Sequence, residues 1–164
     1  MTRMNYNVFT IGQHTYLLAA TERGLSFVGS QDQGVTELKQ FYPNVTELTD
    51  NISELEVFAR QLAEYLSGQR TKFELQTDVN GTEFQKIVWK RLDQIPYGQT
   101  TDYSKIAADI GHPNAYRAVG TAVGKNPLLM IVPCHRVLTK SGLLGDYRGG
   151  TAMKRELLTL EGSL

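Results

Sequence analysis

The chain has 164 residues, of which 41% are hydrophobic and 21% are charged. These proportions are typical of a globular protein and exclude wholesale disorder, and the length suits one ordinary domain or two small ones that share a core. A single cysteine excludes an internal disulfide and any zinc site built from several thiolates, which favours a reducing compartment.

The charges are balanced over the whole chain but not along it. Residues 1–80 carry six basic and ten acidic side chains, whereas residues 81–164 carry eleven and seven. Any polyanionic partner is therefore expected to meet the C-terminal half. The first residues lack the apolar core of a secretory signal, and no apolar stretch approaches bilayer-spanning length. We expect a soluble, cytoplasmic protein with no membrane partner.

The first thirty residues predict three strands joined as an antiparallel meander. Apolar and β-branched residues surround Val8, Tyr16 and Phe27, and turn residues such as Gly12 and Gly24 separate them.

Helices are predicted after these strands. A short one at 35–41 stops before Pro43. A longer one ends near Gly68 and is followed by a possible strand at 72–75. Its apolar face is predicted to consist of Ile52, Leu55, Phe58, Ala59, Leu62 and Leu66. Nothing in this half has a catalytic pattern, so residues 1–80 are interpreted as a scaffold domain.

The sequence changes character near Asn80, and residues 81–164 are expected to form a second, mainly helical domain. Thr82 and Gln85 have the spacing of a capping box, which predicts a helix that ends before Pro96. Its apolar face is predicted to consist of Phe84, Ile87, Val88, Leu92 and Ile95. Trp89 is interpreted as a core residue.

Two further helices are predicted on either side of a glycine-containing break at 111–113. The first is capped by Thr101 or Asp102, and the second runs from about residue 114 to 123. A helix, a short turn and a second helix rich in small residues together form the pattern of a helix-turn-helix, although two packed helices are common in any helical protein. Small side chains allow close approach to a duplex, and Arg117 is placed to reach into it.

The only cysteine lies in the segment Ile131-Val132-Pro133-Cys134-His135-Arg136-Val137. A free cysteine is often an inert buried residue, and at neutral pH a thiol nucleophile needs a base or a positive environment. His135 is the candidate base, and since adjacent side chains seldom point the same way, a bridging water is expected between it and Cys134. A histidine base needs an acceptor to orient it, and Glu161, at the end of the last helix, is the candidate.

These residues together resemble the O6-alkylguanine-DNA alkyltransferases, which repair DNA by direct reversal. The resemblance covers about half of the chain in collinear order, and its Pro133-Cys134-His135-Arg136-Val137 motif is highly specific. The other matching segments are Gly81-Thr82-Glu83-Phe84-Gln85, Val88-Trp89, Ile95-Pro96-Tyr97-Gly98, Arg117-Ala118-Val119-Gly120, Asn126-Pro127, Tyr147, Gly149-Gly150, Leu157-Leu158 and Glu161-Gly162.

The resemblance implies an α+β fold. A small N-terminal antiparallel sheet with helices, of the ribonuclease H-like type, would precede a C-terminal helical domain with a winged-helix-like helix-turn-helix. It also implies that Cys134 accepts the alkyl group, that a water-linked His135 and Glu161 generate its thiolate, and that Asn126 is the hinge between the recognition helix and the active-site segment.

The resemblance further implies how the base and the duplex are held. Tyr103 would hydrogen-bond a flipped base, the Val137 carbonyl would read the guanine amino group, and Arg117 would fill the gap in the stack. The pocket lining and the backbone N–H groups that face O6 would come from Tyr147, Arg148 and Gly149. The minor-groove helix would present its small residues Ala115, Ala118 and Gly120.

The implied partner is double-stranded DNA containing O6-alkylguanine, bound by a monomer that would be nucleoid-associated in a prokaryotic cell. Activity on O4-alkylthymine stays open. A thioether has no easy hydrolytic exit, so one turnover per molecule is expected, with no cofactor and no metal. Asp146 and Arg148 stand at the expected pocket mouth, where smaller or neutral residues are common in the family, and so bear on the size of alkyl group accepted.

Two other functions fit parts of the sequence. A helix-turn-helix regulator would not need Cys134, His135 or Glu161. A cysteine hydrolase that turns over repeatedly would not need Arg117 or the small-residue helix. Only the alkyltransferase interpretation uses both sets of residues.

Overall fold

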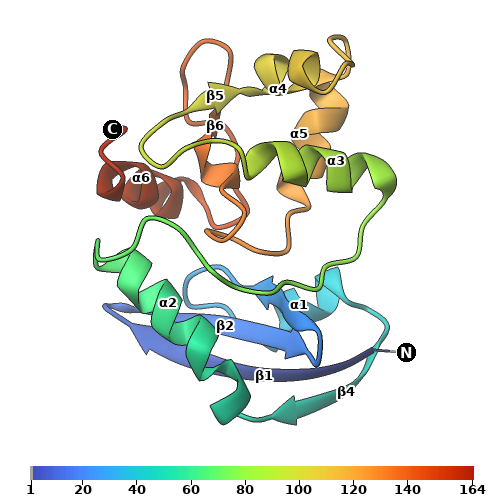
Figure 1. The fold of residues 1–164 in the computed structure, drawn as a ribbon, viewed down its shortest axis with the longest axis vertical. Helices are drawn as coiled ribbons and strands as arrows, with labels where there is room; N and C mark the ends of the chain where they lie inside the picture. Colours follow the sequence, from blue (N-terminus) through green and yellow to red (C-terminus); the bar gives the residue numbers. More distant parts are fainter. Residues whose placement is uncertain (1) are drawn as a thin grey trace. The chain divides into compact units, whose positions relative to one another are not determined.

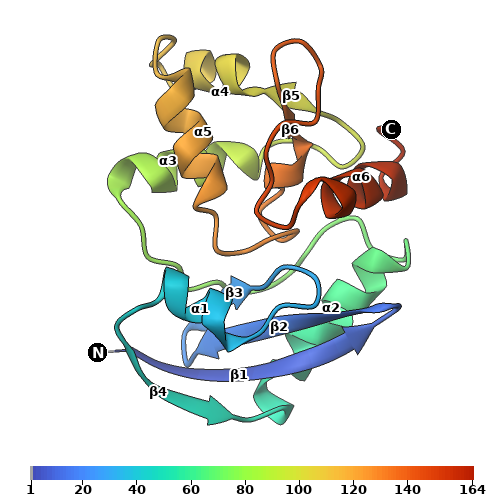
Figure 2. The ribbon, with the colours of Figure 1, turned by 180° about the vertical axis from the view of Figure 1, so that it is seen from behind.

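The computed structural model describes residues 2–164, which divide into two compact units that meet in sequence between Val79 and Asn80 (Figures 1 and 2). The first unit contains a small sheet with helices, and the second is mainly helical. The expected α+β fold class is confirmed.

The sheet of the first unit has the strand order β3-β2-β1-β4. Strands β1 (Thr2–Ile11), β2 (His14–Thr21) and β3 (Gly24–Val28) form the antiparallel meander predicted from the sequence. Strand β4 (Val45–Asp50) was not predicted and pairs with β1 in parallel. Only Val45 and Leu48 in it pack against the core, so this mostly polar edge strand carries little periodic signal.

Helices cover both faces of this sheet. Helix α2 (Glu56–Leu66) lies in front of it in Figure 1, and α1 (Val35–Phe41) lies in front of it in Figure 2, where the view is reversed. Because successive side chains of a strand point to opposite faces, covering both faces buries a continuous run. In β2 this run is Tyr16–Ala20, every residue of which is buried.

Two expectations for this unit were wrong. Ile52 is 50% exposed, because a 3-10 turn, η1 (Ser53–Leu55), precedes α2 and takes Ile52 off its buried face. Residues 72–75 form no strand. The Gln61 side chain instead accepts from the Glu74 N–H (2.9 Å) and donates to the Glu74 carbonyl (3.2 Å), so a helix side chain takes the bonds that a neighbouring strand would supply.

The second unit begins with α3 (Glu83–Leu92), which packs on α5 (Tyr116–Gly124). Trp89 is buried as expected, and its indole N–H donates to the Ala122 carbonyl at 2.9 Å. Gly81 allows this packing, since a Cβ there would lie 2.7 Å from the Trp89 ring. Ile87, predicted on the apolar face, is 49% exposed, because the packed face of α3 is carried by Val88, Trp89 and Leu92.

Helix α4 (Tyr103–Asp109) packs on α5 across a short turn, and Asp102 caps it by accepting from the Lys105 N–H at 2.8 Å. Just before α4, β5 (Thr101–Asp102) pairs in parallel with β6 (Val137–Leu138), a pairing that was not predicted. Strand β6 directly follows the 3-10 turn η2 (Cys134–Arg136), and α6 (Thr151–Leu160) closes the unit.

The capping box of α3 provides a first prediction. The Thr82 hydroxyl accepts from the Gln85 N–H (3.1 Å), and the Gln85 side chain accepts from the Thr82 N–H (2.9 Å). Thr82→Ala removes one of these bonds and should lower the free energy of unfolding by about 1 kcal/mol. Urea midpoints measure the loss, with the exposed Thr71→Ala as control. Equal midpoints for the two variants would contradict it.

Candidate active site

Cys134 begins η2, directly after Pro133, and is only 4% exposed. Its N–H donates to the Val132 carbonyl at 2.7 Å. Burial raises the pKa of the Cys134 thiol, while a hydrogen bond from Asn126 and the positive charges of Arg148 and Lys154 lower it. The thiol therefore depends on its polar surroundings to become a thiolate.

Asn126 fixes the segment that leads from α5 to Cys134. Its side chain, 1% exposed, donates to the Val132 carbonyl at 2.9 Å and to the Leu128 carbonyl at 3.3 Å, and accepts from the Leu128 N–H at 2.9 Å. One amide thus satisfies three backbone groups of a buried turn. The turn contains Met130 with φ 72°, a left-handed conformation that a non-glycine residue adopts only when its surroundings enforce it.

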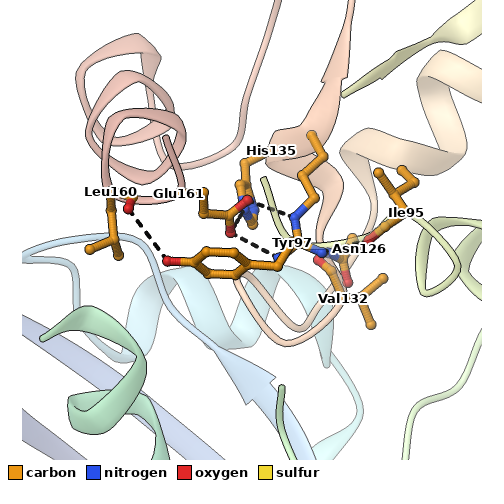
Figure 3. A network of polar contacts seen from close by, with 8 residues as sticks. Ile95, Tyr97, Asn126, Val132, His135, Leu160 and Glu161 are labelled. Carbon is orange, nitrogen blue, oxygen red and sulfur yellow. Dashed lines mark hydrogen bonds and ion pairs between the residues drawn. The ribbon is translucent and has the colours of Figure 1, made fainter. Parts of the chain in front are cut away.

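Glu161 lies at the centre of a buried polar network (Figure 3). Its carboxylate lies 2.8 Å from His135 Nε2, and both side chains are fully buried. Arg136 donates to both carboxylate oxygens, from Nε at 2.8 Å and from Nη2 at 2.9 Å, and donates from Nη1 to the Ile95 carbonyl at 2.7 Å. The structure thus brings His135 and Glu161 together as expected.

Arg136 explains how a carboxylate can stand at the C-terminal end of α6, where the helix dipole disfavours it. A two-pronged guanidinium contact is the strong form of a charge-assisted bond, and it leaves one oxygen shared with His135. The Arg136 guanidinium also lies over the Tyr97 ring, 5.7 Å from its centroid. No role was predicted for Arg136 from the sequence, although it lies inside the specific motif.

His135 has the properties of a base rather than of a resident cation. Burial lowers the pKa of His135, and Glu161 opposes that shift. The Nε2 side of the ring faces the carboxylate, so Nε2 is assigned as the protonated nitrogen of the neutral ring and Nδ1 as the basic one. A proton accepted at Nδ1 would give an imidazolium that Glu161 stabilises.

Tyr103 lies beside this centre, at the start of α4. Burial raises the pKa of its phenol, and the negative charges of Cys134 and Asp146 add to the shift. Gly145 lies close by, with φ 71°, and a Cβ there would be 3.1 Å from Thr139 and 3.7 Å from the Tyr103 hydroxyl. Tyr103 and the loop 139–149 are therefore brought together near Cys134.

The same loop carries the other predicted binding residues. Arg148 donates from Nη2 to the Asn126 carbonyl at 3.0 Å, which ties the loop to the segment between α5 and Cys134. A Cβ at Gly149 would lie 2.4 Å from Met153 Sδ and 2.8 Å from the Tyr147 ring, so any larger residue there would displace these side chains. Val137, fully buried in β6, contributes its carbonyl to Lys154, a residue to which the sequence analysis assigned no function.

The predicted DNA-contacting residues lie on α5 and in its N-terminal cap, apart from the His135–Glu161 network. Arg117 and Ala118 are exposed, and Ala115 and Gly120 are half-buried. The Arg117 guanidinium lies 6.0 Å from the centroid of the Tyr116 ring, and Tyr116 is itself 47% exposed. This surface presents one long cation and one aromatic ring among small side chains.

Within residues 2–164, no helix is both long and apolar enough to cross a membrane. No group of three His, Cys, Asp or Glu residues in that range is arranged to hold a metal ion.

Comparison with known proteins gives matches to both units. Residues 83–163 match the DNA-binding domain of 6-O-methylguanine DNA methyltransferase, and residues 15–79 match its ribonuclease-like domain. The inducible methylated-DNA–protein-cysteine methyltransferase of Bacillus subtilis is 47% identical over 89% of this chain and 83% of its own length. The enzyme of the same name from Methanosarcina acetivorans is 42% identical over 98% and 99%.

Solved structures agree with these matches. The crystal structure of Mycobacterium tuberculosis O6-methylguanine methyltransferase has a TM-score of 0.83 and 38% identity, over 98% of this chain and 93% of that one. The same organism's OGT in complex with DNA has a TM-score of 0.83 and 39% identity, over 99% and 94%.

Proposed function

The chain belongs to the 6-O-methylguanine DNA methyltransferase family, and we propose that it repairs DNA by moving an alkyl group from guanine O6 to its own Cys134 sulfur. Its activity is that of a methylated-DNA–protein-cysteine methyltransferase. The observation that carries the proposal is the buried contact of 2.8 Å between His135 and Glu161, since His135 directly follows the only cysteine of the chain.

The reaction uses these residues as a relay. His135 takes the thiol proton of Cys134 through a water, and Glu161, held by Arg136, stabilises the imidazolium. The thiolate sulfur then bonds to the alkyl carbon as the carbon–O6 bond breaks. The electron pair of the broken carbon–O6 bond stays on the guanine oxygen, and guanine takes up one proton to become the ordinary base. Thiol and alkylguanine thus give thioether and guanine, with no cofactor consumed.

The base must leave the duplex before it can meet a thiol that is 4% exposed. We assign α4 and α5 to a helix-turn-helix whose small-residue face enters the minor groove, and Arg117 to the gap that the flipped nucleotide leaves. Tyr103 would contact the flipped base, and Asn126 would link α5 to the Cys134 segment. The base would be enclosed by Val137, Tyr147, Arg148 and Gly149.

We predict one turnover per molecule, because the thioether formed at Cys134 has no route back to the thiol. Alkylated duplex DNA in excess should yield repaired guanine up to about one equivalent of protein, and then no more. The measurement is a titration of product against protein concentration. Product that keeps accumulating past one equivalent would favour a cysteine hydrolase instead.

A further inference from the structure

Lys154 is a fully buried lysine on the apolar face of α6, beside Met153, Leu157 and Leu158. Lysine is seldom buried unless its charge is compensated. Its ammonium donates to three backbone carbonyls, those of Val137 (2.7 Å), Leu144 and Asp146 (3.4 Å). Three acceptors match the three N–H donors of an ammonium group.

These carbonyls come from two separate segments, both of which precede Lys154 in the sequence. Val137 follows Cys134 by three residues, in β6, and Leu144 and Asp146 belong to the loop before α6. Gly145, with its positive φ of 71°, turns the chain between the two loop carbonyls. One ammonium group therefore links the strand after the acceptor cysteine to the loop that approaches Tyr103.

We infer that Lys154 is a positioning residue for the alkylated base: its ammonium sets the direction of the Val137 carbonyl and the conformation of the loop at 144–146. This inference rests on the proposed function, in which the Val137 carbonyl faces the 2-amino group of guanine and the loop at 144–146 leads into Tyr147, Arg148 and Gly149, which enclose the base. A carbonyl oxygen has two lone pairs, so Val137 can accept from Lys154 and from the 2-amino group together.

The energetics favour a positioning role over a purely stabilising one. An ammonium loses its hydration when it is buried, and an apolar side chain of similar volume is often as stable or more stable at such a site. Burial lowers the pKa of Lys154 to about 8, although the negative charges of Cys134 and Asp146 oppose the shift, so the ammonium form prevails at pH 7. The charge of the ammonium draws electron density from the Val137 oxygen, which makes that oxygen a weaker acceptor for the base. Lys154 therefore contributes to base binding by fixing the geometry of the carbonyl.

The test compares two free substrates, O6-benzylguanine and O6-benzylhypoxanthine, which lacks the 2-amino group. The unaltered protein should react about 10-fold faster with the guanine compound, since losing one hydrogen bond to a buried carbonyl costs roughly that factor. In Lys154→Met the ratio of the two rates should fall towards one. The control Lys140→Met removes an exposed lysine of the same loop and should keep the full ratio.

Different results would overturn the role of Lys154 and the proposed alkyl transfer. If both rates fall by the same factor in Lys154→Met and the ratio persists, Lys154 only supports the fold and the inference is overturned. The same holds if the unaltered protein shows no preference. If the unaltered protein reacts with neither compound, the proposed function itself fails.

A second measurement covers the case in which Lys154→Met does not fold. With 15N-labelled lysine, the Lys154 ammonium should give a slowly exchanging side-chain signal near pH 6, assigned by its loss in Lys154→Arg. In the Cys134→Ser variant, O6-benzylguanine should shift this signal more than O6-benzylhypoxanthine does. Equal shifts, or a signal that exchanges as fast as that of an exposed lysine, would overturn the inference.

Discussion

Glu161→Gln is expected to lower both the stability and the alkyl-transfer rate of the protein. The free energy of unfolding should fall by about 3 kcal/mol, because removing one partner of a buried ion pair leaves the other charge uncompensated. That partner is Arg136, whose side chain is 8% exposed and bonds both oxygens of the carboxylate. An amide keeps one oxygen acceptor and turns an N–H donor towards either Arg136 or His135, which are donors themselves.

The transfer rate should fall by about 10²-fold, which is the usual scale for losing general-base assistance. His135 is already driven towards its neutral form, because burial lowers its pKa and only Glu161 opposes this. Without the carboxylate, the imidazolium that forms when Cys134 is deprotonated has no negative partner. Single-turnover rates on benzylated free guanine and urea midpoints measure the two effects.

Two matched variants make this result interpretable. Glu161→Asp keeps the charge and should retain more stability than Glu161→Gln. Glu156→Gln removes an exposed charge from the same helix and should leave the transfer rate unchanged. A Glu161→Gln protein that is destabilised but transfers alkyl groups at the parent rate would limit Glu161 to a structural role.

Arg117→Ala is expected to separate DNA handling from chemistry. The side chain is exposed at the start of α5, next to the Tyr116 ring and among small residues, so it can extend into a duplex. Filling the gap left by a flipped nucleotide offsets part of an unstacking cost of a few kcal/mol. Losing about 2 kcal/mol of that compensation should slow repair of alkylated duplex DNA by roughly 30-fold.

Benzylated free guanine needs no flipping, so Arg117→Ala should react with it at nearly the parent rate. Arg155→Ala removes another exposed arginine of the second unit and serves as the control for net charge. Losses of equal size on both substrates would show that Arg117 supports the fold or the pocket. Parent rates on both substrates would make it an ordinary surface charge.

Local signals in the sequence predicted much of the fold. Apolar runs separated by glycine turns predicted the meander of β1 to β3, and the Thr82–Gln85 spacing predicted the start of α3 with its capping box. Features that depend on distant partners were missed. Strand β4 is ordered by its parallel register with β1. In the segment 72–75, the Gln61 side chain bonds the Glu74 backbone in place of a neighbouring strand. Neither contact leaves a periodic pattern in the sequence.

The active site shows the same division. The motif around Cys134 and a histidine's need for an acceptor led to Glu161, and the structure places that carboxylate at His135. The second partner of Glu161, Arg136, is adjacent to His135 in sequence, but its guanidinium reaches the carboxylate only because α6 folds back onto η2. Lys154 could have been noticed, since its spacing from Leu157 and Leu158 places it on the same buried face of α6.

The most direct test of the account is the intact mass of the protein after reaction with benzylated free guanine, followed by peptide mapping. The parent protein is expected to gain one benzyl group per chain, located on Cys134. Cys134→Ser should gain none, because a serine hydroxyl is a poor nucleophile at neutral pH, but it should still bind duplex DNA. An unchanged mass for the parent protein, an adduct on any other residue, or more than one benzyl group per chain would contradict it.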